Sequence, residues 1–340
     1  MTEEISKRIK VIGFLMTCVI VMYHTGKPDF FVNEYDLKLN MMIAQVNDVL
    51  AGLAMSWFFT VSGFLLFRNL NKITYKFKVV RRINSLLIPY ILWQMITVVK
   101  QLIQGDELNF QNIISNIFFF GAWPPDGALW YVYVVFWLAV ISPVFLVLFS
   151  NRNIGWAMVI GLCIAVYIVG ISDDLFLSKI VAYGYVGNIL GYFQSYLIGS
   201  YYGYYSEQIE GAEGLKYIVV LFMVTLIIDV VYSGLFLRTI IRVLPIMMLY
   251  LLPIKMIPGN LKIFKFSFLI YAIHQPLMYD LKGKVYSLLQ PVFHYACIVN
   301  VLSKVMILGI YLCIACIIYY VLNRISPSVL KILTGGRTKN

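Results

Sequence analysis

Long apolar runs separated by short polar segments are the dominant pattern along the chain. Ten runs of 17 to 26 residues can be placed, with approximate bounds at 9–26, 45–67, 84–104, 129–149, 154–171, 183–203, 216–232, 235–253, 264–280 and 297–322. A helix rises ~1.5 Å per residue, so about 20 residues cross a hydrocarbon core of ~30 Å. The pattern therefore predicts an all-α, polytopic membrane protein with about ten transmembrane helices.

The amino-acid composition supports this interpretation. Of the 340 residues, 61% are hydrophobic and 13% are charged, and the mean hydropathy is +0.83, whereas soluble domains have about 25% charged residues. The longest polar gaps, 27–44 and 105–128, are too short to form a soluble domain. We therefore expect a single membrane-embedded domain over residues 1–340. The first run lacks a small-residue cleavage site, which predicts a retained span rather than a signal peptide.

Positive charge is concentrated in alternate polar segments. If the amino terminus is cytoplasmic, 18 of the 27 Lys and Arg residues fall in cytoplasmic segments. These residues are Lys7, Arg8, Lys10, Arg68, Lys72, Lys76, Lys78, Arg81, Arg82, Arg152, Lys216, Lys255, Lys262, Lys265, Arg324, Lys331, Arg337 and Lys339. The bias follows the positive-inside rule and predicts that both termini are cytoplasmic. It also accounts for the net charge of +11, so we expect no nucleic-acid partner.

A single histidine, His24, stands near the far end of the first apolar run. Ionisable groups at membrane depth are costly and usually face a cavity or the bundle interior. One interpretation is structural, with the imidazole hydrogen-bonded at the outer interface between Tyr23 and Lys27. The functional interpretation is a base or nucleophile in a water-accessible cavity, because imidazole titrates near neutral pH. Lys10 lies on the same helix face, about 21 Å before His24.

A basic run precedes the third apolar segment and contains Lys78, Arg81 and Arg82. Its structural interpretation is an anchor for lipid headgroups and a topology signal. The functional interpretation is a cradle for a phosphate-bearing cytoplasmic cosubstrate, because the guanidinium fork binds phosphate oxygens in pairs.

A third group of polar residues lies within the later apolar runs. Arg238 and Arg242 are one helical turn apart, and Asp229 lies across a short hairpin from them. Either Asp229 and Arg238 form a pair that offsets their burial, or the arginines hold an anionic or hydroxyl-rich acceptor on the outer side. His274 precedes Pro276, which is predicted to break the ninth helix, so its imidazole either bonds internally or lines the cavity.

Two further motifs have simpler interpretations. Small residues recur every four positions in the sixth run and predict a close helix–helix contact, either an intramolecular seam or a homodimer face. These residues are Gly187, Gly191, Ser195, Gly199 and Gly203. Cys313 and Cys316 form a C-x-x-C without a third ligand nearby, which favours helix packing, and we expect no metal site.

Five short segments, in a fixed order and spacing, resemble acyltransferase family 3. They are Val21–His24, Phe58–Leu66, Arg81–Tyr90, Gly127–Tyr131 and Phe266–Pro276. Members of this family are integral-membrane enzymes that O-acylate bacterial surface polysaccharides and related glycans. The resemblance extends over essentially the whole chain, and the family's ten-helix core agrees with the count of apolar runs.

The resemblance implies transfer of an acyl group, most often acetyl, from cytoplasmic acyl-CoA to a hydroxyl of an outward-facing glycan. Acetyl-CoA would be the cosubstrate, and a glycan or lipid-linked saccharide the acceptor, in the cell membrane of a bacterium. His24 matches the family's catalytic histidine. The acceptor-binding candidates are Arg238, Arg242, His274, Trp130 and Tyr131.

The donor site departs from the family pattern at the first helix. A cation linked to the acyl donor usually lies eleven residues before the histidine, where this chain has Gly13. Lys10 is the nearest substitute, one turn further down and on nearly the same helix face.

The basic run departs from the pattern as well. The family has paired arginines four residues apart, but here Arg81 is followed by Ser85. Lys78 and Arg82 are four apart and could supply the pair in a shifted register. In the resulting hypothesis these cations bind the CoA phosphates, and His24 acts as a base or as a transient acyl carrier. The main alternative is a transporter or flippase for a glycan or lipid-linked sugar.

Overall fold

The computed structural model describes residues 1–106, 109–118, 124–171, 185–209, 219–220, 222–223, 236–254 and 257–337. Within these ranges every regular element is helical and no strand occurs. The chain falls into two compact units. Unit 1 contains Met1–Met16, Val49–Val79 and Leu138–Gly259, and unit 2 contains Thr17–Asp48, Val80–Trp137 and Asn260–Asn340.

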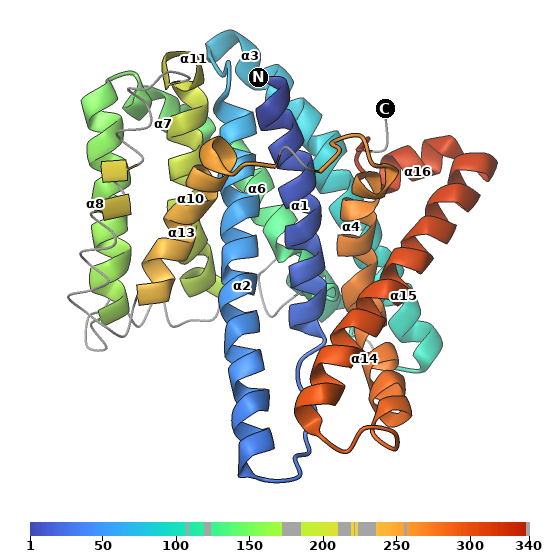
Figure 1. Ribbon diagram of the computed structural model, residues 1–340. Helices are drawn as coiled ribbons and strands as arrows, with labels where there is room; N and C mark the ends of the chain where they lie inside the picture. Colours follow the sequence, from blue (N-terminus) through green and yellow to red (C-terminus); the bar gives the residue numbers. More distant parts are fainter. Residues whose placement is uncertain are drawn as a thin grey trace. The chain divides into compact units, whose positions relative to one another are not determined.

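The helices are labelled in Figure 1. Most belong to one unit, while α1, α2, α3 and α6 contain residues of both. The shared helices are α1 (Glu3–His24), α2 (Glu34–Phe67), α3 (Lys72–Arg82) and α6 (Trp130–Val140). Unit 1 also contains α7 (Ser142–Phe149), α8 (Arg152–Ile171), α10 (Tyr185–Tyr204), α11 (Ser206–Ile209) and α13 (Phe236–Leu251). Unit 2 also contains η1 (Ile83–Leu87), α4 (Ile88–Gln104), α5 (Phe110–Ile117), η2 (Gly127–Leu129), η3 (Lys262–Phe266), α14 (Ser267–Leu289), α15 (Ala296–Ile325) and α16 (Pro327–Leu333).

Helices occupy the predicted apolar runs wherever the structure describes them, although several edges differ. Helix α2 begins at Glu34 rather than near residue 45, and α14 continues to Leu289 rather than 280. The run predicted at 129–149 is bent by 55° between Val140 and Ser142. The run at 216–232 lies outside the described residues, apart from 219–220 and 222–223.

Some of the described helices are long and apolar enough to cross a membrane. By length and composition these are Glu34–Phe67, Lys72–Gln104 and Ala296–Ile325, and the bent pair would make a fourth. In α15 only 17% of the most apolar stretch is buried, so this helix presents hydrocarbon outward, as a helix in lipid does. A helical membrane protein is therefore supported, whereas the count of ten spans, the single domain and the cytoplasmic termini stay predictions.

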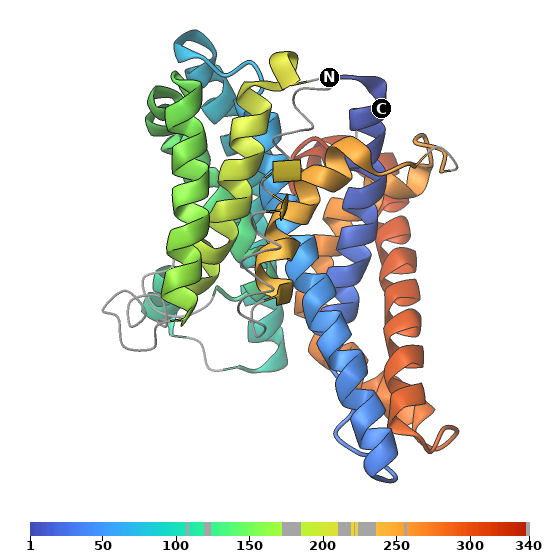
Figure 2. The same cartoon turned by 60° about the vertical axis from the view of Figure 1, so that its left-hand side comes forward.

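In unit 1, α10 packs against α8 and α13 (Figure 2) and also contacts α2 through its glycines. A Cβ on Gly199 would lie 2.0 Å from the carbonyl oxygen of Thr60, and one on Gly203 would lie 2.4 Å from that of Phe64. The Thr60 hydroxyl donates to the Ser195 carbonyl at 3.2 Å. This part of the predicted ridge therefore forms an intramolecular seam. The surroundings of Gly187 and Gly191 lie outside the described side chains, and the homodimer face stays a prediction.

We expect Gly199→Ala to destabilise the protein, because the added methyl group would collide with the Thr60 backbone rather than with a flexible side chain. Overpacking of this kind costs about 1–3 kcal/mol. The check is the thermal denaturation midpoint of the detergent-purified protein. Gly161→Ala in α8 is the matched control, since a Cβ there meets nothing within 4 Å. Equal midpoints for the two variants would contradict the seam.

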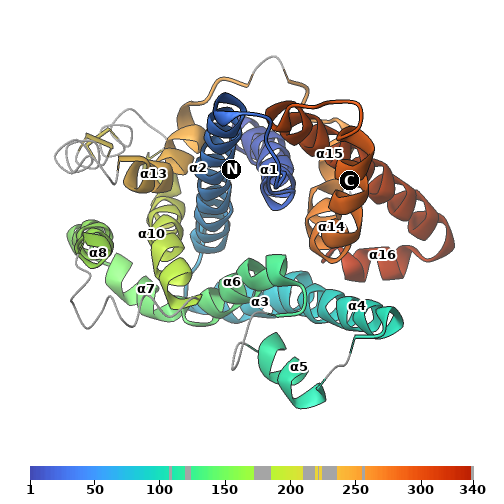
Figure 3. The same ribbon diagram turned by 90° about the horizontal axis from the view of Figure 1, so that it is seen from below.

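In unit 2, α14 packs along α15, and α16 returns against α4 (Figure 3). The prediction that Pro276 breaks the ninth helix is wrong, because α14 continues through it. Two carbonyls near the proline accept additional hydrogen bonds from other helices: Tyr311 donates its hydroxyl to the His274 carbonyl at 2.7 Å, and Lys100 donates to that of Pro276. Contacts with neighbouring helices of this kind accompany proline inside membrane helices.

Candidate active site

His24 is the last residue of α1, and the chain turns sharply just after it. Gly26 has a φ of +74°, a left-handed conformation that suits glycine and commonly ends a helix. The buried Thr25 bonds back to the Val21 carbonyl through both its N–H (3.2 Å) and its hydroxyl (3.1 Å). The helix end therefore follows from the sequence Thr-Gly directly after the histidine.

Three side chains from three helices hold this turn in place. Asn47 of α2 donates to the Met22 carbonyl at 3.2 Å, and Tyr286 of α14 donates to that of Thr25 at 2.9 Å. The ammonium group of Lys304 in α15, which is 6% exposed, donates to the Gly26 carbonyl. The last carbonyls of a helix carry partial negative charge, so these donors satisfy them. The result is a fixed backbone beneath the His24 side chain.

The His24 ring is half-buried and lies against a second histidine. Its centroid is 5.0 Å from that of the His274 ring, with the two planes tilted by 49°. His274 is fully buried, and its Nδ1 lies 2.6 Å from the Tyr271 carbonyl oxygen. A carbonyl can only accept, so Nδ1 carries the proton and Nε2 carries the lone pair. Among the described residues, Nε2 has no hydrogen-bond partner.

Tyr271 connects this pair to Tyr131, one of the predicted acceptor-binding residues. Their rings meet edge to face with centroids 6.4 Å apart, and the Tyr271 ring centroid is 5.6 Å from that of His274. The Tyr271 hydroxyl donates to the Ala128 carbonyl. Trp130 is half-buried beside Tyr131 at the start of α6. The structure thus brings Tyr131 and His274 into one cluster with His24.

The turn that carries Tyr131 is attached to α4 by two residues. Asp126 accepts a hydrogen bond from Ala128 N at 3.2 Å, which caps η2. The Gln94 side chain accepts from Asp126 N at 2.8 Å and donates to its carbonyl at 3.1 Å. Both residues are fully buried, and burial strengthens such paired bonds. The motif Gly127–Tyr131 is therefore held rigidly.

The basic run contributes Arg81 and Arg82 to unit 2, directly before η1. Arg82 and Tyr131 both interact electrostatically with Arg337, a residue that sequence reasoning assigned only to the cytoplasmic cations. The Arg337 guanidinium lies 4.2 Å from the centroid of the Phe268 ring and donates to the Thr334 carbonyl at 3.0 Å. Ring contacts within unit 2 therefore lead from the histidine pair through Tyr271 to Tyr131, and electrostatic interactions link Tyr131 to Arg337 and Arg337 to Arg82.

The other two cations predicted to bind the acyl donor, Lys10 and Lys78, lie in unit 1. Lys10 is exposed. Lys78 donates to the carbonyls of Leu66 (2.7 Å) and Arg68, at the end of α2. Lys78 therefore has a structural use, and its role in donor binding, like that of Lys10, stays a prediction.

The predicted acceptor-binding arginines also belong to unit 1. Arg242 is half-buried, with its guanidinium 4.8 Å from the centroid of the Tyr192 ring. The side chain of Arg238 and the whole of Asp229 lie outside what the structure describes. Their roles in acceptor binding stay predictions.

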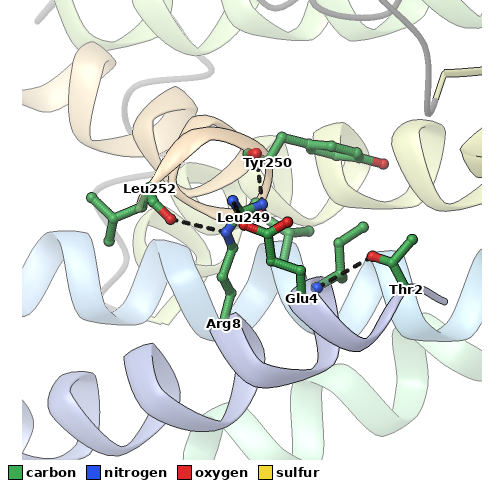
Figure 4. Close-up of polar contacts among 7 residues, drawn as sticks. Thr2, Glu4, Arg8, Leu249, Tyr250 and Leu252 are labelled. Carbon is green, nitrogen blue, oxygen red and sulfur yellow. Dashed lines mark hydrogen bonds and ion pairs between the residues drawn. The ribbon is translucent and has the colours of Figure 1, made fainter. Parts of the chain in front are cut away.

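Arg8 has a structural role that the sequence did not reveal. It is 7% exposed and donates to the carbonyls of Leu249 (3.1 Å), Tyr250 (2.6 Å) and Leu252 (2.9 Å), and it pairs with Glu4 at 2.5 Å (Figure 4). These carbonyls end α13, where positive charge is favourable. The Glu4–Arg8 spacing of one turn was the available signal, but it does not identify the distant partner.

The family model for the acyltransferase domain of acyltransferase family 3 matches residues 13–324. The chain belongs to acyltransferase family 3. It is therefore a membrane acyltransferase. The family match includes His24, His274 and Arg82, but it begins after Lys10 and ends before Arg337. Searches among curated proteins and among solved structures find no match to the chain.

Proposed function

We propose that this family 3 enzyme transfers an acyl group, in the first instance acetyl, from acetyl-CoA to a hydroxyl of an extracytoplasmic glycan or lipid-linked saccharide. The observation that carries the proposal is the His24–His274 pair. The ring of His24 is half-buried at a rigid helix end, and its centroid lies 5.0 Å from that of the buried His274 ring. The tautomer of His274 is set by its bond to the Tyr271 carbonyl. This arrangement suits proton transfer in a protected site.

In the proposed reaction, His24 accepts the proton of the acceptor hydroxyl as that oxygen attacks the thioester carbonyl carbon. A carbon–oxygen bond forms and the carbon–sulfur bond breaks, which leaves the acyl ester and the CoA thiolate. The His24 imidazolium then returns the proton to the thiolate sulfur. His274 is a positioning residue, because its buried Nε2 lone pair is available to accept a hydrogen bond from the imidazolium.

Contacts within unit 2 support a donor of the CoA type. The Tyr271 ring lies next to His274 and meets the ring of Tyr131. Tyr131 interacts electrostatically with Arg337, which also interacts with Arg82. Arginine side chains suit the phosphates of CoA, and aromatic rings suit a less polar arm. The thioester would then reach His24 along the tyrosines, away from water that would hydrolyse it.

The position of His24 supports an acceptor on the outer side. It ends the helix that begins with cations predicted to be cytoplasmic, about 21 Å beyond Lys10 along the helix axis. The enzyme would therefore act in the cell membrane of a bacterium, with the donor inside and the saccharide outside.

Transport is less well supported than acyl transfer. A proline-broken helix was one reason to consider a transporter, because broken helices hold the substrates of many transporters. Helix α14 is continuous through Pro276, so this feature is absent from the described helix.

The proposal is tested with inverted membrane vesicles or nanodiscs that contain the purified protein. The assay supplies acetyl-CoA labelled in its acetyl group, together with surface glycan from the host. We expect ester-linked label on the glycan and release of free CoA in equal amounts. Movement of glycan across the membrane without label would indicate a flippase and contradict the proposal.

A further inference from the structure

The four residues after α16, Thr334–Arg337, lie beyond the end of the family match, next to the contact of α16 with α4. Trp93 of α4 donates its indole N–H to the Leu333 carbonyl at 3.1 Å. The Thr334 hydroxyl donates back to the Leu330 carbonyl at 2.7 Å. The next two residues, Gly335 and Gly336, have φ of +60° and +76°, which glycine adopts without strain. The segment therefore has a defined path that ends at Arg337.

Gly335 brings this segment into close contact with the basic run. A Cβ on Gly335 would lie 2.4 Å from the Ser85 carbonyl oxygen and 2.7 Å from Arg337 Nη1, so these two atoms are at most about 5.1 Å apart. Ser85 lies in the π-helical turn η1, four residues before Pro89. Proline has no N–H to donate to that turn, which leaves carbonyls there open to other contacts. Arg337 is thereby placed beside the turn that Arg82 precedes.

The two arginines lie close enough for their like charges to interact. The pKa of Arg337 is lowered to about 10, first by desolvation and then by the positive charge of Arg82, so the guanidinium stays protonated at neutral pH. The residue as a whole is exposed. No carboxylate lies within ion-pair distance of Arg337 in the part of the chain that the structure describes. Arg337 also lies against the Phe268 ring, donates to the Thr334 carbonyl and interacts electrostatically with Tyr131. An anion placed between the two cations would remove their repulsion.

We propose that Arg82 and Arg337 together bind a phosphate group, and that Thr334–Arg337 is a structural part of this site. Two guanidinium forks provide donors in planes that match the oxygens of a phosphate. The ring of Phe268 lies against the fork of Arg337, which also donates one hydrogen bond to the Thr334 carbonyl. The inference rests on the proposed function only for the identity of the phosphate carrier, which we assign to the acyl-CoA donor rather than to a lipid headgroup.

The test uses the full-length protein in nanodiscs of zwitterionic lipid, with CoA itself as the non-acylating probe in calorimetry. We expect Arg337→Gln to weaken CoA binding roughly ten- to hundredfold, as for loss of a hydrogen bond to a charged group. Arg337→Lys should lose less, because it keeps the charge but not the fork. Arg324→Gln, which removes an exposed cation at the end of α15, is the matched control and should bind CoA as the wild type does.

A second variant separates the position of Arg337 from its charge. Gly335→Ala keeps both arginines but adds a methyl group that collides with the Ser85 backbone and strains a positive φ. We expect it to weaken CoA binding as Arg337→Gln does. Gly283→Ala in α14 is its control, since a Cβ there meets nothing within 4 Å. Unchanged binding in both Gly335→Ala and Arg337→Gln would overturn the inference.

A further pair of measurements distinguishes the two sources of phosphate. The same proteins are compared in nanodiscs that contain phosphatidylglycerol. If Arg337→Gln changes only the retention of this anionic lipid and leaves CoA affinity as in the wild type, the donor assignment is wrong. If the wild type itself binds no CoA in either lipid, the proposed function fails rather than this site alone.

Discussion

Replacing His24 with alanine is expected to reduce acyl transfer to the uncatalysed background while leaving the amount of protein in the membrane unchanged. A general base contributes roughly 10²- to 10⁴-fold to a rate, and in the proposed reaction no other described group accepts the hydroxyl proton. The protein should still fold, because the turn after His24 is held through backbone carbonyls, by Asn47, Tyr286 and Lys304. The measurement is transfer of labelled acetyl to the host glycan in nanodiscs.

His294→Ala is the matched control, because it removes an imidazole from the loop before α15 and outside the candidate site. It should retain wild-type transfer. His24→Gly offers a second readout, since added imidazole can occupy the vacated space and restore part of the rate. Full activity in His24→Ala would exclude His24 from the chemistry, whatever the fold.

The same assay separates the two roles considered for His24. As a base, it never carries the acyl group, so wild-type protein incubated with labelled acetyl-CoA and no acceptor should remain unlabelled after a rapid quench. An acyl-imidazole intermediate would leave label on the wild type and none on His24→Ala. We expect the first result.

Much of the fold follows from local patterns. Apolar runs of membrane-crossing length predict helices, and the described helices occupy those runs. The end of α1 at His24 is also local, because the Thr-Gly pair that follows supplies the turn. Edges were less predictable: α14 continues past Pro276, and there Lys100 and Tyr311, from other helices, bond to its carbonyls. No window of sequence around Pro276 contains that information.

The candidate site was predictable as a set of residues but not as an arrangement. His24 and His274 stood out as histidines in apolar runs, yet their 5.0 Å separation depends on the packing of α1 and α14. Charge in a loop was a poorer guide. Lys78 satisfies the end of α2, and Arg8 satisfies the end of α13. From the sequence, Lys78 was considered a contact to the acyl donor, and Arg8 was considered a topology signal.

Arg337 illustrates what a stronger sequence signal would have been. The pair Gly335-Gly336 directly before it permits two successive residues with positive φ, which marks a tight and defined turn rather than an unstructured tail. That turn meets η1 close to Ser85, where the resemblance would have placed a second arginine. The contact joins residues 250 positions apart (Ser85 and Gly335), so only the folded structure brings the two cations together.

The second large effect is expected at His274. Two substitutions, to asparagine and to glutamine, distinguish the role of its Nδ1 from that of its Nε2. Asparagine can replace the Nδ1–H that bonds to the Tyr271 carbonyl, but it has no group at the position of Nε2. Glutamine reaches the Nε2 position and can present an acceptor there. If Nε2 stabilises the His24 imidazolium, His274→Asn should lower kcat by roughly 10- to 100-fold, as for a hydrogen bond to a charged group.

The split between kinetic constants distinguishes this role from a purely structural one. The KM for acetyl-CoA should stay close to that of the wild type in His274→Asn, because the lost interaction forms only as charge develops on His24. His274→Gln should retain several-fold more activity than His274→Asn at equal membrane abundance. Both variants bury one amide in place of a neutral ring, so general damage to packing would lower their activities together. Equal losses of activity in the two variants, or an effect confined to KM, would therefore contradict the proposed contact. The position of the acceptor atom matters only if its lone pair is directed at the His24 imidazolium.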